Sequence, residues 1–307
     1  MTLLAEGLRI QEWLSDPALA EMLRPVVITG LAIAVLCAPL SLLVVLKRLA
    51  FIGQGISHAA FGGWGVASIL AGASASGGAL VYVGDFAAST RGQLAIVFAL
   101  CLLAALIISW LTHSKGSAKN RSLEPDTAIG VVLVASMALG AVLNRLAANP
   151  RPWESFLFGS IAECGPEDAH VALVAMGAVL LVLIVARRGL TFWAFDEPAS
   201  RAFGVNGRLM SALLMTLLAL ATVVSMRLVG VVPATALLVL PGATALRLTR
   251  RWGPAIAWSI IVALLGVVLG LFASLELDLL PGSSIVLALT TLFAIAPLIA
   301  RVTKARA

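Results

Sequence analysis

His58 is the residue whose chemistry points most directly to a function. It follows Gln54 by four positions in the segment Gly53-Gln-Gly-Ile-Ser-His-Ala59, so both side chains lie on one face if the segment is helical. Neutral imidazole is a good ligand for zinc, manganese and iron, and an ionisable group inside an apolar segment usually faces a water-filled path or a bundle interior. His58 therefore indicates a position on a passage for a metal ion. The alternative is that His58 hydrogen-bonds a backbone carbonyl and only supports packing.

Two acids, Glu124 and Asp126, precede a later apolar segment. Carboxylates are favourable at a helix start because that end carries partial positive charge, and this local role, with ion pairs to nearby basic residues, explains both acids without a transported ion. A family resemblance described below implies a second interpretation, a contribution to metal passage, so both join Gln54 and His58 as candidate metal-path residues. Cys37, Cys101 and Cys164 have no CxxC spacing and are interpreted as small apolar residues. No permanently bound cofactor is expected.

The elements that hold these residues are predicted to be membrane-spanning helices. Hydrophobic residues make up 61% of the 307 positions and charged residues 12%, against about 25% charged in soluble domains. A helix needs roughly 20 mostly apolar residues to cross a bilayer. The fold class is therefore an all-α polytopic membrane protein with eight to nine spans, since 226 and 229 are too close for a normal loop. The spans are expected near 25–46, 56–72, 93–111, 127–143, 171–186, 209–226, 229–246, 254–273 and 284–300.

The distribution of Lys and Arg predicts the orientation, because basic loops tend to stay in the cytoplasm. An outside N-terminus places the basic clusters around 47–48, 115–121, 187–208, 247–251 and 301–306 inside. The predicted organisation is an N-terminal interfacial segment (1–24), a permease domain (25–300) with a cytoplasmic loop near 187–208, and a basic cytoplasmic tail (301–307). The net charge of +6 fits loops facing anionic lipid. No basic stripe interleaved with aromatic residues suggests nucleic-acid binding.

Five segments together resemble the permeases of the zinc, manganese and iron class of ABC importers. The first runs from Leu46 to Ala67 and contains a basic pair followed by the Ser-His-Ala motif. The others, in the family's order, are Glu124-Pro-Asp-Thr-Ala-Ile-Gly130, Leu157-Phe-Gly-Ser160, Ala194-Phe-Asp-Glu-Pro-Ala-Ser-Arg-Ala-Phe-Gly-Val-Asn206 and the run from Val229 to Ala245 that contains Pro241-Gly-Ala-Thr-Ala.

The resemblance implies a permease of the type II ABC importer kind, which moves a divalent transition metal into the cytoplasm across the inner membrane. It implies three partners: a cytoplasmic ATP-binding subunit, an extracytoplasmic metal-binding protein, and a second permease, identical or related. The chain itself is not expected to be an enzyme, and it contains no GxxxxGK[ST] phosphate loop. The loop 194–206 corresponds to the family's coupling loop, with Asp196 and Glu197 before Pro198 as a helix start and Gly204 as a helix stop. Its candidate residues are Asp196, Glu197, Arg201, Ala202 and Gly204.

Gln54 departs from the family pattern, in which an Asp commonly precedes the His by four positions. An amide is a weaker ligand than a carboxylate for a hard divalent cation, so a non-metal or chelated substrate is the first alternative. A secondary transporter is the second, although the sequence has almost no acids within the predicted spans and no clear inverted halves. The sequence leaves open which metal is carried and whether the two permeases are identical.

Overall fold

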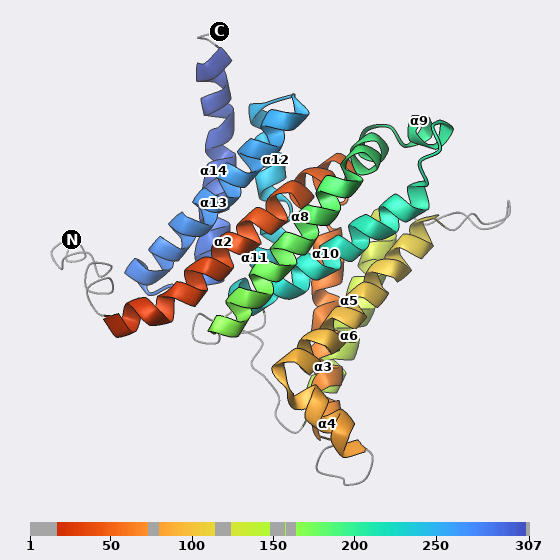
Figure 1. The fold of residues 1–307 in the computed structure, drawn as a ribbon, viewed down its shortest axis with the longest axis vertical. Coiled ribbons are helices and arrows are strands. Elements are labelled where there is room, and N and C mark those ends of the chain that lie inside the picture. Colours follow the sequence, from red (N-terminus) through yellow and green to blue (C-terminus); the bar gives the residue numbers. More distant parts are fainter. Residues whose placement is uncertain (1–16, 73–79, 114–123, 148–156, 158–163, 305–307) are drawn as a thin grey trace. The chain divides into compact units, whose positions relative to one another are not determined.

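The computed structural model describes residues 17–72, 80–113, 124–147, 157 and 164–304. These residues form helices joined by short turns, and none of them lies in a β-strand. The all-α prediction is confirmed. The helices (Figure 1) are α2 (Pro17–Leu46), α3 (Ile52–Gly72), α4 (Leu80–Ala88), α5 (Thr90–His113), α6 (Pro125–Leu146), α8 (Pro166–Phe195), α9 (Glu197–Ala202), α10 (Gly207–Val229), α11 (Val231–Leu237), α12 (Leu240–Leu248), α13 (Trp252–Leu277) and α14 (Pro281–Lys304).

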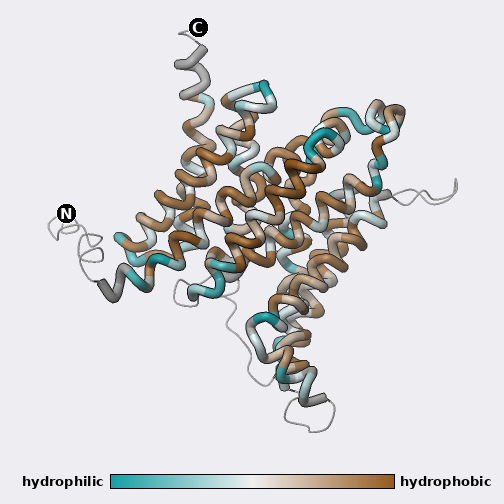
Figure 2. The backbone as a smooth tube through the Cα atoms, viewed as in Figure 1, coloured by the Kyte–Doolittle hydropathy of each residue, from teal (hydrophilic) through white to brown (hydrophobic). Residues whose placement is uncertain are grey.

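Eight helical segments in the described part of the chain are long and apolar enough to cross a membrane. Figure 2 shows hydrophobic residues along the lengths of these helices, with hydrophilic residues gathered mainly at helix ends and turns. The prediction of a polytopic membrane protein with eight to nine spans is confirmed. α2 begins at Pro17 and continues through the first span, whereas residues 1–16 of the predicted interfacial segment lie outside the described residues.

Helix α3 corresponds to the span expected near 56–72 but is not among the eight apolar segments. Its 21 residues are long enough for a bilayer, about 31 Å at 1.5 Å per residue, but they include Gln54, Ser57 and His58. Most of its residues are buried against other helices. A helix shielded from lipid does not need an apolar surface all round, so the buried Ser57 and the half-buried His58 cost less there.

The chain divides into two compact units. The first unit comprises residues 1–45, 157–184 and 224–307, and the second comprises residues 46–156 and 185–223. In the first unit, α13 and α14 pack as an antiparallel pair, with Gly266 against Leu289 and Gly270 against Ile285. Two glycines four residues apart thus let the backbones of α13 and α14 approach closely, as small residues do in membrane helix pairs.

The span expected at 229–246 is broken in two. α11 ends at Leu237, α12 begins at Leu240, and Pro241 lies in the first turn of α12, where its missing N–H costs no hydrogen bond. A Cβ on Gly242 would lie 2.5 Å from the backbone carbon of Ser41, so α12 approaches the backbone of α2 where only glycine fits. Pro233 lies in the first turn of α11, so the interruption falls between the two prolines.

In the second unit, α3 packs against α4, α5 and α6 (Figure 1). Sequence analysis did not anticipate α4, a short helix between two predicted spans. α3 and α6 run in the same direction, because Gly55 lies against Ile129 and Gly62 against Ser136. Cys37, Cys101 and Cys164 are all buried, which agrees with their interpretation as small apolar residues.

Candidate functional site

The candidate metal-path residues all belong to the second unit, at the starts of α3 and α6. Gln54 and His58 occupy the first two turns of α3, and Asp126 lies in the first turn of α6. Because α3 and α6 are parallel and Gly55 contacts Ile129, these residues lie at the same end of the helix pair. The packing therefore gathers the candidate ligands that are distant in the sequence toward one end of the unit.

His58 is half-buried and Gln54 is exposed. Neither side chain forms a hydrogen bond or ion pair with another described residue, and in particular no backbone carbonyl of the described chain accepts a hydrogen bond from the imidazole. The packing alternative for His58 expected such a bond. An imidazole held in place by helix packing, with its nitrogens unoccupied by protein groups, is suited to binding a ligand from outside the chain.

Glu124 is the N-cap residue of α6, but its side chain makes no capping hydrogen bond. Its backbone carbonyl accepts the bond from the Ala128 N–H. Asp126 is exposed in the first turn, where its charge complements the partial positive charge of the helix start. Both carboxylates are thus placed by the helix start, and neither is held in an ion pair with a described residue. The basic cluster 115–121, expected to pair with them, lies within residues that the structure leaves undescribed.

No group of three His, Cys, Asp or Glu side chains in the described ranges is close enough to hold a metal ion. Stable protein sites for transition metals generally use three or four side-chain ligands. Among the described residues, His58 and its neighbours therefore supply fewer side-chain ligands than such a site uses. Their arrangement fits weak contact with a passing ion, or a ligand set that is completed by another chain.

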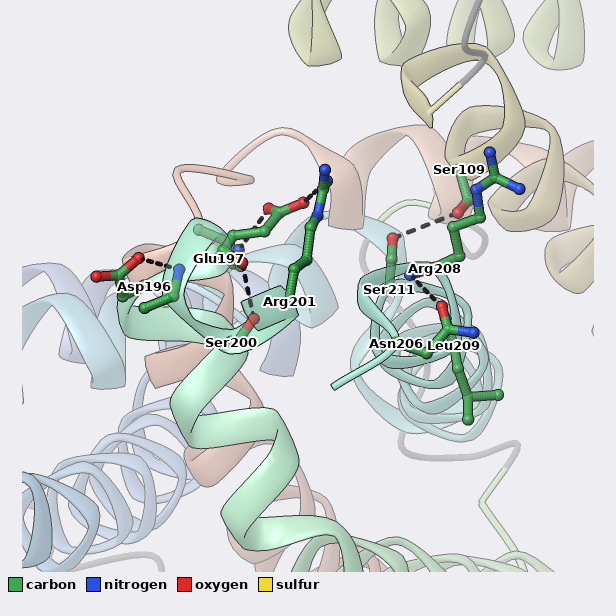
Figure 3. A network of polar contacts seen from close by, with 11 residues as sticks. Ser109, Asp196, Glu197, Ser200, Arg201, Asn206, Arg208, Leu209 and Ser211 are labelled. Atoms are coloured by element: carbon green, nitrogen blue, oxygen red, sulfur yellow. Dashed lines mark hydrogen bonds and ion pairs between the residues drawn. The ribbon is translucent and has the colours of Figure 1, made fainter. Parts of the chain in front are cut away.

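The loop expected to contain a short surface helix does contain one. α9 begins after Asp196, whose carboxylate accepts a hydrogen bond from the Ala199 N–H at 2.9 Å. The helix ends before Gly204, which has a φ of +82°, a conformation that glycine adopts without strain. The predicted helix start at Asp196 and stop at Gly204 are confirmed. Figure 3 shows Asp196 at the start of α9 and Arg201 reaching back to Glu197.

Glu197 is the centre of the polar contacts on α9. It accepts bonds from Arg201 at 2.6 Å, within the same helix, and from Lys47 at 3.0 Å. Partial burial by itself would raise the pKa of Glu197, but the hydrogen bonds and positive charges of Lys47 and Arg201 outweigh it and hold the pKa below its ordinary value. Glu197 is therefore ionised at neutral pH. Ala202, by contrast, is exposed at the end of the helix.

Sequence analysis missed the role of two residues near α9. Lys47 was expected only as part of a basic cluster that sets orientation and of the basic pair in the family-like segment, and Trp193 was not singled out. In the structure, the Lys47 ammonium lies 3.7 Å from the centre of the Trp193 ring. A basic residue directly after a span is a general feature of membrane proteins. The local sequence therefore does not distinguish an ordinary loop Lys from one that pairs with a residue 150 positions away.

Several known proteins are similar to this chain over nearly its full length. The manganese import system permease protein ScaB of Streptococcus parasanguinis is 30% identical over 292 residues, which cover 95% of each chain. The high-affinity zinc uptake system membrane protein ZnuB of Haemophilus influenzae is 29% identical over 274 residues, covering 89% of this chain and 95% of the relative.

A solved structure shares the fold. PsaBC from Streptococcus pneumoniae, determined in complex with Fab, superposes with a TM-score of 0.74 at 26% identity, covering 94% of this chain and 93% of that chain. The model of the ABC 3 transport family matches residues 19–300. The match spans almost all the helices described above, including α3 with His58 and α9. The chain belongs to the ABC 3 transport family.

Proposed function

We propose that this chain is the membrane permease subunit of an ATP-driven importer that carries manganese, zinc or iron into the cytoplasm. The half-buried, unbonded imidazole of His58 at the start of α3 is the observation that carries the proposal, because imidazole is a ligand common to these three metals. The relatives named for manganese and zinc transport support the same substrate class.

The partners follow from what this chain contains. Its sequence has no phosphate-binding GxxxxGK[ST] loop, so ATP hydrolysis belongs to a separate cytoplasmic subunit. We propose that α9 is the coupling helix that docks onto that subunit, with Asp196, Glu197, Arg201, Ala202 and Gly204 in or beside the contact. An extracytoplasmic binding protein delivers the metal. A second permease pairs with this one, which agrees with the lack of a three-ligand group in the described ranges of a single chain.

Uptake by a reconstituted complex tests the proposal. Proteoliposomes that hold the permease, its ATPase and its binding protein should accumulate Mn²⁺, Zn²⁺ or Fe²⁺ when ATP is supplied, and not when a non-hydrolysable ATP analogue replaces it. Uptake of a metal chelate but of none of the three free ions would favour the chelate permease. Accumulation driven by an ion gradient without ATP would identify a secondary transporter and overturn the proposal.

The proposed orientation places the N-terminus outside and the C-terminus in the cytoplasm of the inner membrane. Asp85 in α4 and Arg250 after α12 are both exposed, and the native cysteines are buried, which lowers background labelling. Asp85→Cys should react with a membrane-impermeant thiol reagent in intact cells, whereas Arg250→Cys should react only after permeabilisation. The cysteine-containing parent protein is the control, and the opposite pattern of labelling would reverse the orientation.

A further inference from the structure

The side chain of Lys47 is enclosed between two residues of the α8–α9 segment. Its ammonium lies 3.0 Å from a carboxylate oxygen of Glu197 and 3.7 Å from the centre of the Trp193 ring. Only 13% of the Lys47 side chain is exposed, and Trp193 is almost fully buried. A cation with so little access to water is stable only when a counter-charge and a polarisable surface replace its hydration. We call these three residues the Lys47 clamp.

The clamp joins α9 to a different part of the second unit. The other ion pair of Glu197, with Arg201, stays within α9, and the hydroxyl of Ser200 also bonds within that helix, to the Glu197 carbonyl. These contacts stabilise α9 itself. Only the bond to Lys47 connects the Glu197 side chain to the segment between α2 and α3.

The segment from Lys47 to α3 is short and tightly folded. Arg48 has a left-handed backbone with a φ of 55°, Leu49 is buried, and the Ile52 N–H donates to the Leu49 carbonyl at 3.0 Å. Gln54 and His58 lie in the first two turns of α3 that follow. A turn held by backbone hydrogen bonds and a buried Leu transmits a displacement better than an open loop would, because it has little freedom to absorb the movement.

We propose that Lys47 is a positioning residue that links the coupling helix α9 to the start of α3, so that movement of α9 on the ATPase displaces the turns that carry Gln54 and His58. The inference rests on the proposed permease function and goes beyond it, because it names the contact through which ATP hydrolysis reaches the metal path. Both ends of the link lie in the second compact unit.

The test compares two neighbouring basic residues. Lys47→Met removes the charge from the clamp and keeps an unbranched side chain. Arg48→Met removes a charge from the same turn, where Arg48 is exposed, and so controls for effects of basic residues on orientation. In the reconstituted complex, Lys47→Met should lower Mn²⁺ uptake per ATP hydrolysed about fivefold, the lower end of typical coupling effects between sites. Arg48→Met should leave the ratio unchanged, and Lys47→Arg, which retains the charge, should recover most of it.

The outcomes separate this inference from the proposed function. If the wild-type complex takes up no metal, the function itself fails. If wild type transports metal and Lys47→Met gives the wild-type ratio of uptake to hydrolysis, the clamp is not a coupling contact. Equal losses of uptake per ATP in Lys47→Met and Arg48→Met would also overturn it, because the loss would then result from removing any positive charge from this turn. If Lys47→Met does not assemble with the ATPase, Glu197→Gln breaks the same bond from the other side, and a wild-type ratio in that variant contradicts the proposal.

Discussion

His58→Ala is expected to reduce metal uptake by the reconstituted complex about a hundredfold while leaving membrane insertion intact. The substitution removes the candidate ligand nitrogen at the start of α3. Loss of residues that merely support a metal ligand costs about 10–100-fold in affinity or activity, so loss of the ligand itself should reach the upper end of that range. Folding should tolerate the change, because the imidazole is half-buried and bonds to no described residue. Uptake of Mn²⁺ and Zn²⁺ and the amount of permease in the membrane are measured together.

Two variants separate metal binding from packing at this position. His58→Asn keeps a polar side chain of moderate size but removes the imidazole ligand, so it should also lose uptake. His170→Ala is the same histidine-to-alanine substitution at an exposed position at the start of α8, and this variant should transport metal normally. Wild-type uptake by both His58 variants would show that His58 only fills space in the bundle.

The membrane helices were predictable because lipid imposes a simple rule on them. In lipid there is no water to bond the backbone N–H and C=O groups, so a long apolar segment must pair them internally and becomes a helix. The expected spans correspond to helices in the structure. α3 tests the limit of that rule. Its hydropathy falls below that of the eight apolar spans, and the prediction there depended on the lack of charged residues between 56 and 72. Burial by neighbouring helices, which a single sequence does not display, is what permits the buried Ser57 and the half-buried His58 in α3, whereas Gln54 is exposed in its first turn.

The broken helix was predictable in kind but not in position. Prolines such as Pro233 and Pro241 disfavour an unbroken helix, but the interruption between Leu237 and Leu240 also depends on tertiary contact. Gly242 lies against the backbone of Ser41, 201 positions earlier in the chain. Ser41 in turn pairs with Ser259, whose hydroxyl donates to the Ala38 carbonyl at 2.6 Å. The packing of three helices determines where this interruption lies, and the local sequence does not indicate that packing.

The two candidate sites differ in the same way. α9 was predicted closely because its start and stop are local: Asp196 caps it through a residue three positions away, and Gly204 ends it through its own backbone conformation. The Lys47 clamp joins residues about 150 positions apart and had no local signal. The candidate metal path is intermediate. His58 was identifiable from its cost inside a membrane, whereas the parallel packing that places it at the same end as Asp126 required the structure.

The exposed position of Gln54 makes it the place where one substitution can alter metal preference. It lies one helical turn before His58 and its side chain bonds to no described residue, so a new carboxylate there would not disturb an existing contact. A carboxylate is a charged oxygen ligand, and hard cations such as Mn²⁺ prefer it to an amide. The effect should be smaller for Zn²⁺, because Zn²⁺ is bound well by the nitrogen of imidazole and the sulfur of thiolate.

Gln54→Asp should therefore lower the KM for Mn²⁺ uptake about tenfold, a change of about 1.4 kcal/mol in binding free energy, with a smaller change for Zn²⁺. Gln54→Asn is the matched control, because asparagine has the size of aspartate but no charge, and it should leave both values near those of wild type. Initial rates of uptake are measured over a range of metal concentrations in the same proteoliposomes. Equal KM values for Mn²⁺ in Gln54→Asp and Gln54→Asn would place Gln54 outside the metal path. If tighter binding slows release into the cytoplasm, the maximal rate falls while KM still decreases, and that pair of changes also locates the side chain beside the transported ion.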